Sequence, residues 1–195
     1  MSRTLKPSLI LAAILICGFA ACNSNDPPAT PKPATPGGPP STAVPMPPVS
    51  GRSLEYLGWT PDGGKRSVLR DYKGQVLVLD FYATWCEPCR RSIPHLIGLQ
   101  NKYADQGLQV IGLNVGGPSD LEKVPAFAKE FGIQYTLAVP EDELVTFLLG
   151  NNDVIPQTFI FDRQLILAEH LIGFGPNAGD RIDRAVEAAL QTPAP

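Results

Sequence analysis

The pattern of hydrophobic and polar positions divides this chain of 195 residues into three parts. An unbroken apolar run, Leu9 to Ile16, lies near the start, and residues 23–50 show no periodic hydrophobicity. From about residue 51, strand patterns and helix patterns alternate. This third part is long enough for one ordinary domain, and a hydrophobic content of 44% is sufficient for a packed core. We therefore expect one folded domain over residues 51–195.

The first elements of this domain are the clearest. Residues 76–82 form a nearly continuous apolar run, which is typical of a strand buried on both faces. A helical pattern follows from residue 86 to about 104 and ends before Gly107, and residues 108–114 read as a second strand. A strand–helix–strand unit of this kind predicts two parallel strands.

The remaining patterns are shorter. A Ser-x-x-Glu capping box at Ser119 predicts the start of a helix that restarts near Pro125 and ends at Gly132. The later segments are a short strand, a short helix, a hairpin of two strands and a closing helix, at residues 134–139, 141–149, 158–162, 165–172 and 180–190. This order predicts an α/β fold, a three-layer α/β/α sandwich around a mixed sheet.

Residues 1–22 have the features of a signal sequence. Arg3 and Lys6 precede the apolar run, and small residues lead to Cys22. The stretch from Leu9 to Cys22 is shorter than the ~20 residues that a membrane-spanning helix needs. Residues 19–22 resemble a bacterial lipobox, although Phe19 stands where Leu is usual, so we expect lipid attachment at Cys22. Simple cleavage near residues 20–21 and an uncleaved anchor are the alternatives, and all three place the remaining chain outside the cytoplasm, in a periplasm or on the outer cell surface.

Residues 23–50 are predicted to be a linker. Ten of these 28 residues are proline, so the segment cannot bury a core. Extended polyproline II structure is expected, which would make it a semi-rigid spacer between the membrane and the domain.

Charge and cysteine content narrow the class of function. The net charge of −3 and the absence of a basic run argue against nucleic-acid binding. Of the four cysteines, Cys17 and Cys22 belong to the N-terminal segment, and Cys86 and Cys89 form a Cys-x-x-Cys. The mature domain therefore has one close pair and no disulfide framework.

The position of this pair favours redox chemistry. Cys86 lies where a buried strand turns into a helix, next to unpaired backbone N–H groups that stabilise a thiolate. Cys89 follows one helical turn later and can resolve a mixed disulfide, and Pro88 suits an early helical position. Half of a zinc site and an inert disulfide are the alternatives. No metal is expected, because a second cysteine pair is absent and His95 and His170 lack ligand spacing.

The segment from Val78 to Arg90, with Trp-Cys-Glu-Pro-Cys at its centre, resembles the active-site signature of the thioredoxin superfamily. The residues after it, among them Arg91 and Pro94, are similar to the TlpA/ResA branch of membrane-associated thiol-disulfide oxidoreductases, and the resemblance covers about residues 53–192. It implies that Cys86 is an exposed nucleophile, Cys89 a buried resolving thiol and Pro94 a helix-kinking proline. It also implies that Ile155 and Pro156 form a cis-proline loop that faces the cysteines and binds substrate backbone.

Several further residues are assigned around this site. Asp80 matches a buried acid that takes a proton from the resolving cysteine, and burial should raise its pKa; an exposed strand-end aspartate is the alternative. Ser92 departs from the branch, which often has Glu there. Trp85 is expected to pack and to shape the substrate surface, and Glu87 to be solvated beside Pro88. His95 is expected to be an ordinary helix residue.

The resemblance predicts an enzyme, a monomeric thiol-disulfide oxidoreductase without a cofactor other than its own disulfide. The Glu-Pro pair between the cysteines lacks histidine and favours reduction of substrates over oxidation. Expected partners are disulfide-bearing extracytoplasmic proteins, including apocytochromes, and a membrane thiol-disulfide electron donor. A peroxiredoxin-like peroxidase is one rival, since Thr84 lies two residues before Cys86, but the proline such enzymes carry upstream is missing. A non-enzymatic lipoprotein binding module or metal chaperone is the other.

Overall fold

The computed structural model describes residues 54–195, which form one seven-stranded sheet with helices packed against it. In spatial order the sheet is β2-β1-β5-β4-β3-β6-β7. The strands are β1 (Gly58–Pro61), β2 (Ser67–Val68), β3 (Val76–Tyr82), β4 (Leu108–Asn114), β5 (Thr136–Pro140), β6 (Gln157–Phe161) and β7 (Leu167–Ile172). The helices are α1 (Glu87–Tyr103), α2 (Pro118–Leu121), α3 (Val124–Phe131), α4 (Asp142–Leu149) and α5 (Ala178–Leu190), with short 3₁₀ turns η1 (Leu54–Tyr56), η2 (Leu69–Tyr72) and η3 (Ala104–Gln106).

The sheet is mixed, as predicted. The central strands β3 and β4 run parallel in register from Val76↔Leu108 to Tyr82↔Asn114, and β5 continues the parallel set. Strand β6 pairs antiparallel with β3, and β7 pairs antiparallel with β6 as the second strand of the predicted hairpin. On the other side, β1 is antiparallel to both β5 and β2.

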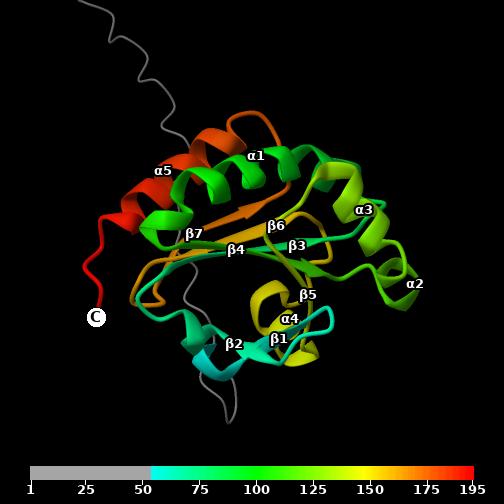
Figure 1. Cartoon of the computed structure of the whole chain (residues 1–195), viewed down its shortest axis with the longest axis horizontal. Coiled ribbons are helices and arrows are strands. Elements are labelled where there is room, and N and C mark those ends of the chain that lie inside the picture. The colour runs from blue at the N-terminus through cyan, green and yellow to red at the C-terminus, as the bar shows by residue number, and fades with distance from the viewer. Residues whose placement is uncertain (1–53) are drawn as a thin grey trace, which may run out of the picture. The chain divides into compact units, whose positions relative to one another are not determined.

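Alternate side chains of β3 enter opposite layers of the core, because successive residues of a strand point to opposite faces. Val76 and Val78 pack in the cluster that contains the buried residues of α1 and α5, whereas Leu77 and Leu79 pack in the cluster that contains α4. Figure 1 shows α1 and α5 on one side of the sheet and α4 on the other. The three-layer sandwich is confirmed.

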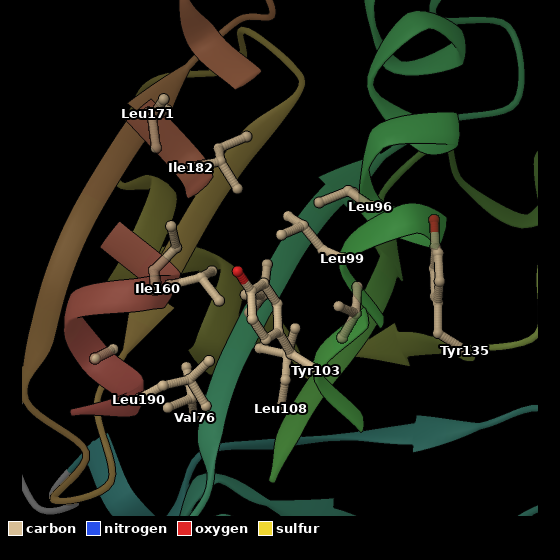
Figure 2. Packing of buried hydrophobic residues seen from close by; sticks show 14 of the residues in the cluster. Val76, Leu96, Leu99, Tyr103, Leu108, Tyr135, Ile160, Leu171, Ile182 and Leu190 are labelled. Atoms are coloured by element: carbon tan, nitrogen blue, oxygen red, sulfur yellow. The ribbon is translucent and has the colours of Figure 1, made fainter. Parts of the chain in front are cut away.

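The layer beneath α1 and α5 is built from large aliphatic side chains. Figure 2 shows Leu96 and Leu99 of α1, Ile182 of α5 and Val76 and Ile160 of the sheet gathered in this cluster. Each of these side chains is at most 4% exposed. This packing holds α1 against the sheet, and α1 begins just after the carboxyl end of β3.

Two parts of the sequence interpretation are corrected. Residues 54–75, to which no element was assigned, hold β1, β2 and two 3₁₀ turns, which are two to four residues long and too short for a periodic pattern. The capping box at Ser119 is wrong, because α2 begins at Pro118 with Gly117 as its N-cap residue and no side-chain cap. The predicted restart near Pro125 is confirmed by α3, which begins at Val124.

Within residues 54–195, no helix combines the length and the apolar character that crossing a bilayer requires. The predicted signal sequence, the lipidation site at Cys22 and the Pro-rich linker lie outside the described residues.

Candidate active site

Cys86 and Cys89 are joined by a disulfide at the start of α1, with a Cα–Cα distance of 5.3 Å. Cys86 is the N-cap residue, and its Sγ accepts a hydrogen bond of 3.2 Å from the backbone N–H of Cys89. Pro88 occupies the first turn, where a helix has no intrahelical use for the missing N–H. The sulfur of Cys86 thus accepts a backbone hydrogen bond at the positive end of the helix dipole. After reduction, the same donor and the helix dipole stabilise its thiolate.

The two sulfurs differ little in exposure. Cys89 is fully buried and Cys86 is 4% exposed, so the prediction of an exposed nucleophile is wrong for this oxidised state. Ile155 is one of the residues that pack against the cluster that contains both cysteines. Its carbonyl oxygen lies 3.7 Å from the Sγ of Cys86. The small solvent-exposed surface of the two cysteines therefore belongs to Cys86.

The loop that carries Pro156 faces the disulfide. The Ile155–Pro156 peptide bond is cis, as the resemblance implied. The backbone N–H of Gly173 donates to the carbonyl oxygen of Pro156 at 2.7 Å, which ties the loop to the end of β7. The side-chain amide of Gln157 donates to the carbonyl oxygens of Asn152 and Val154, at 3.0 and 2.9 Å. The loop is therefore held from two sides, while its role in substrate binding stays a prediction.

Trp85 and Val154 provide apolar surface near the cysteines. Trp85, the residue before Cys86, is 65% exposed, and Val154, in the proline loop, is 51% exposed. Trp85 is therefore not a core packing residue, and its large apolar side chain is free to contact a partner. Glu87 is solvated as expected, with its carboxylate 3.8 Å from the guanidinium of Arg91.

Asp80 is a buried carboxyl group beneath α1. It is 1% exposed, so the alternative of an exposed strand-end aspartate is wrong. Burial raises its pKa from 3.8 to about 7, although a hydrogen bond from the hydroxyl of Thr158 acts in the opposite direction. That bond measures 2.7 Å. By strand alternation Asp80 points to the same face as Val78 and Tyr82, and Tyr82 packs in the cluster that contains Cys89. The strand thus directs a carboxyl group that titrates near neutral pH into the layer that holds the resolving cysteine.

Three further residues of α1, named from the sequence, lie after Cys89: Ser92, Pro94 and His95. Ser92 is buried, and its hydroxyl donates to the carbonyl oxygen of Cys89 at 2.9 Å. Pro94 lies inside α1, where it removes one backbone donor; the predicted kink stays a prediction. His95 lies with its Nε2 atom 3.1 Å from the carboxylate of Asp183 on α5, a contact between two helices. Residues 54–195 contain no cluster of three or more His, Cys, Asp or Glu arranged to hold a metal ion.

Asp120 is a site residue that the sequence interpretation missed. Its carboxylate accepts hydrogen bonds from the backbone N–H of Thr84 at 2.9 Å, from the Thr84 hydroxyl, and from the amide of Asn114 at 2.8 Å. It therefore binds the loop that leads into Cys86. The available signal was its place just after the carboxyl end of β4, the parallel neighbour of β3, where side chains from two strands meet.

The fold, the disulfide at the start of α1 and the cis-proline loop together define a thioredoxin-like domain. The chain belongs to the AhpC/TSA family, whose family model matches residues 53–170.

Individual relatives are consistent with this class. The chain is 34% identical over 101 residues to the thiol-disulfide oxidoreductase ResA of Geobacillus thermodenitrificans, an alignment that covers 51% of this chain and 56% of the relative. With ResA of Bacillus subtilis it shares 33% identity over 101 residues, covering 51% and 54% of the two chains. The chain thus spans a little over half the length of these curated relatives.

Solved structures extend the likeness to the whole fold. A thiol:disulfide interchange protein of the thioredoxin family from Chlorobium tepidum superposes with a TM-score of 0.59 at 28% identity, covering 73% of this chain and 99% of that one. StoA from Bacillus subtilis superposes with a TM-score of 0.53 at 19% identity, covering 67% and 94%, and supports the fold alone.

Proposed function

We propose that this protein is a thiol-disulfide oxidoreductase that exchanges electrons with disulfides of other proteins through Cys86 and Cys89. One observation carries the proposal. At the start of a helix, the Cys86 sulfur accepts a hydrogen bond from the Cys89 backbone N–H, and it faces the carbonyl oxygen of Ile155. An inert structural disulfide needs neither a helix N-terminus nor a facing loop. The names of the ResA relatives support the same reaction.

In the reducing direction, the thiolate of Cys86 attacks one sulfur of a substrate disulfide. A mixed disulfide forms, and the other substrate sulfur leaves as a thiolate. Cys89 then loses its proton and attacks the Sγ of Cys86, which releases the second substrate thiolate. The substrate gains two electrons, and the protein is left with the Cys86–Cys89 disulfide seen in the structure.

Asp80 is proposed as the group that accepts the proton of Cys89. A pKa of about 7 makes this carboxyl group exchange protons readily near neutral pH, which is what a general base requires. Cys89 is fully buried, so bulk water has little access to its thiol. A base in the same layer of the core provides a proton acceptor inside the protein.

The direction and the setting of the reaction form the finer part of the proposal. Glu87 and Pro88 between the cysteines include no histidine, which favours a reductant. The signal-like N-terminus supports a periplasmic or outer-surface location with a lipid anchor at Cys22. A monomer of this kind would reduce extracytoplasmic proteins, apocytochromes among them, and would be recharged by a membrane thiol-disulfide carrier.

A peroxidase is disfavoured by the surroundings of Thr84. The hydroxyl of this residue donates to the buried carboxylate of Asp120, so it is engaged away from Cys86. Cys86 is also paired with a partner only three residues away, at the start of the same helix. Peroxide consumption that persists after Cys89→Ser would revive this alternative.

The proposal is tested by trapping substrates in the native organism. In Cys89→Ser the resolving thiol is absent, so substrate proteins should remain attached to Cys86 and be released by a reductant. Cys86→Ser is the matched control and should trap nothing. If neither variant accumulates adducts, and the purified wild-type chain fails to reduce insulin disulfides, the proposed function is wrong.

A further inference from the structure

The short loop between β3 and α1 is held by side chains from two helices, Asp120 of α2 and Arg90 of α1. Thr84 lies in this loop, and all three of its polar groups are engaged. Its N–H and its hydroxyl donate to Asp120, and its carbonyl oxygen accepts a hydrogen bond of 3.4 Å from the guanidinium of Arg90. Thr84 is 7% exposed and Asp120 is 1% exposed, so the two bonds between them are shielded from water.

The carboxylate of Asp120 is itself firmly placed. The amide of Asn114, at the end of β4, donates to it at 2.8 Å. Gly116 gives it room, since a Cβ atom there would lie 2.3 Å from the nearest carboxylate oxygen. Burial acts to raise the pKa of Asp120, but the hydrogen bonds from Thr84 and Asn114 outweigh it and leave the pKa below its ordinary value.

Arg90, the second side chain that binds Thr84, is also held in place. Its guanidinium pairs with Glu130 of α3 and lies 4.8 Å from the centre of the Phe131 ring and 5.5 Å from that of Phe127. Ion pairing and ring contacts restrict a side chain that would otherwise be flexible. Thr84 is thus held between α2 and α1, two residues before Cys86.

We infer that Asp120 is a positioning residue for the attacking thiol: by binding Thr84 it fixes the loop that places the Cys86 sulfur on the backbone N–H of Cys89. The loop between Tyr82 and Cys86 has no regular secondary structure of its own, and its one internal bond runs from the Cys86 N–H to the Ala83 carbonyl at 3.2 Å. Without the contact to Asp120, Cys86 leaves its N-cap geometry more often. The thiolate then loses part of the stabilisation that the helix start provides.

Loosening the loop and removing a negative charge affect the Cys86 pKa in opposite directions. Asp120→Ala removes every acceptor for Thr84 and should raise the thiol pKa by about one pH unit. Consider a pH below the Cys86 pKa of both the wild type and Asp120→Ala. There the variant should be alkylated about three-fold more slowly, because its thiolate fraction is about ten-fold lower while each thiolate is about three-fold more nucleophilic. If Asp120 acted through its charge alone, Asp120→Ala would instead lower the pKa.

Variants of Thr84 and Asp120 distinguish positioning of the loop from a direct effect of the Asp120 charge. Asp120→Asn keeps an acceptor oxygen but loses the charge, so the Cys86 pKa should stay at or slightly below the wild-type value and well below that of Asp120→Ala. Thr84→Val removes one hydrogen bond and should give part of the effect, whereas Thr84→Ser keeps the hydroxyl and should rescue it. The double variant Thr84→Val/Asp120→Ala should behave as Asp120→Ala alone, because both changes act on one contact.

The measurement is the pH dependence of iodoacetamide reaction at Cys86 in the reduced full-length chain, followed by peptide mass spectrometry. Gln100→Leu is the matched control, since Gln100 bonds the Leu108 carbonyl and the Val110 N–H at the far end of α1, at 3.1 and 2.7 Å. It should lower the melting temperature without moving the pKa of Cys86.

The inference rests on the proposed function only in taking Cys86 as the attacking thiol. No substrate is used, so a failure of disulfide exchange leaves this measurement intact. Two results would overturn the inference: equal lowering of the thiol pKa by Asp120→Ala and Asp120→Asn, or profiles for Asp120→Ala and Thr84→Val that match Gln100→Leu.

Discussion

Replacing Asp80 by Asn should make the protein lose a strong pH dependence of stability. Asp80 is 1% exposed, and its pKa is raised from 3.8 to about 7 in the folded state. Between these two values the unfolded chain has released the proton while the folded protein still holds it. The folded state then binds more protons, so its stability falls as the pH rises from about 4 to about 7 and stays low above that.

The size of the effect follows from the pKa difference. From 3.8 to about 7 is roughly three pH units, each worth about 1.4 kcal/mol. Ionisation of Asp80 therefore costs the folded state about 4 kcal/mol at pH 8 and only about 0.6 kcal/mol at pH 4. Asn has no ionised form and keeps an oxygen to accept the Thr158 hydroxyl, but it buries an amide donor. That cost is the same at every pH and cancels when two pH values are compared.

The assay is urea unfolding of the oxidised proteins, followed by tryptophan fluorescence at pH 4 and pH 8. In the oxidised state neither cysteine titrates. The free energy of unfolding of Asp80→Asn minus that of wild type should rise by about 3–4 kcal/mol between the two pH values. Thr158→Val should enlarge the pH dependence of the wild type, because the hydrogen bond it removes lowers the Asp80 pKa. A difference between Asp80→Asn and wild type that is constant with pH would refute a carboxyl group with a raised pKa.

Three further predictions concern the surroundings of the site. Trp85→Ala should leave the melting temperature nearly unchanged, because the side chain is 65% exposed, while the KM for a protein disulfide rises and that for a small disulfide does not. Gln157→Leu removes two hydrogen bonds to the Pro156 loop and should cost about 1–2 kcal/mol of unfolding free energy, with a larger loss of kcat/KM for protein than for small disulfides. Gly112→Ala would place a Cβ 2.6 Å from a methyl of Leu137, and urea unfolding should show a loss of about 1–3 kcal/mol; an unchanged midpoint would contradict the packing described.

The central part of the fold could be predicted from the sequence because its signals are local. A nearly continuous apolar run of seven residues predicts β3, and the change to a helical period after Cys86 predicts α1. The burial of Asp80 followed from the apolar residues on either side of it. By contrast, β1 and β2 have four and two residues, and strands this short are defined by their pairing partners rather than by a pattern.

What the sequence could not supply are contacts between distant segments. The resemblance implied that the loop with Ile155 faces the cysteines, but it did not show that Cys86 is only 4% exposed beside this loop, 69 residues further along the chain. The role of Asp120 depends on Thr84, 36 residues before it, and the local Ser-x-x-Glu spacing pointed to a helix cap instead. Both required knowing which loops meet at the carboxyl edge of the sheet.

The central claim is that Cys86 attacks disulfides and Cys89 resolves the product. The most direct measurement is the reaction of the purified, reduced single variants with a peptide disulfide, followed by intact mass and peptide mapping. Cys89→Ser should acquire one peptide at Cys86 and keep it, because no thiol is available to release it. Cys86→Ser should leave the fully buried Cys89 unmodified on the same time scale. Equal rates of modification at Cys86 and Cys89 in the two variants would contradict the assignment of attacking and resolving thiols.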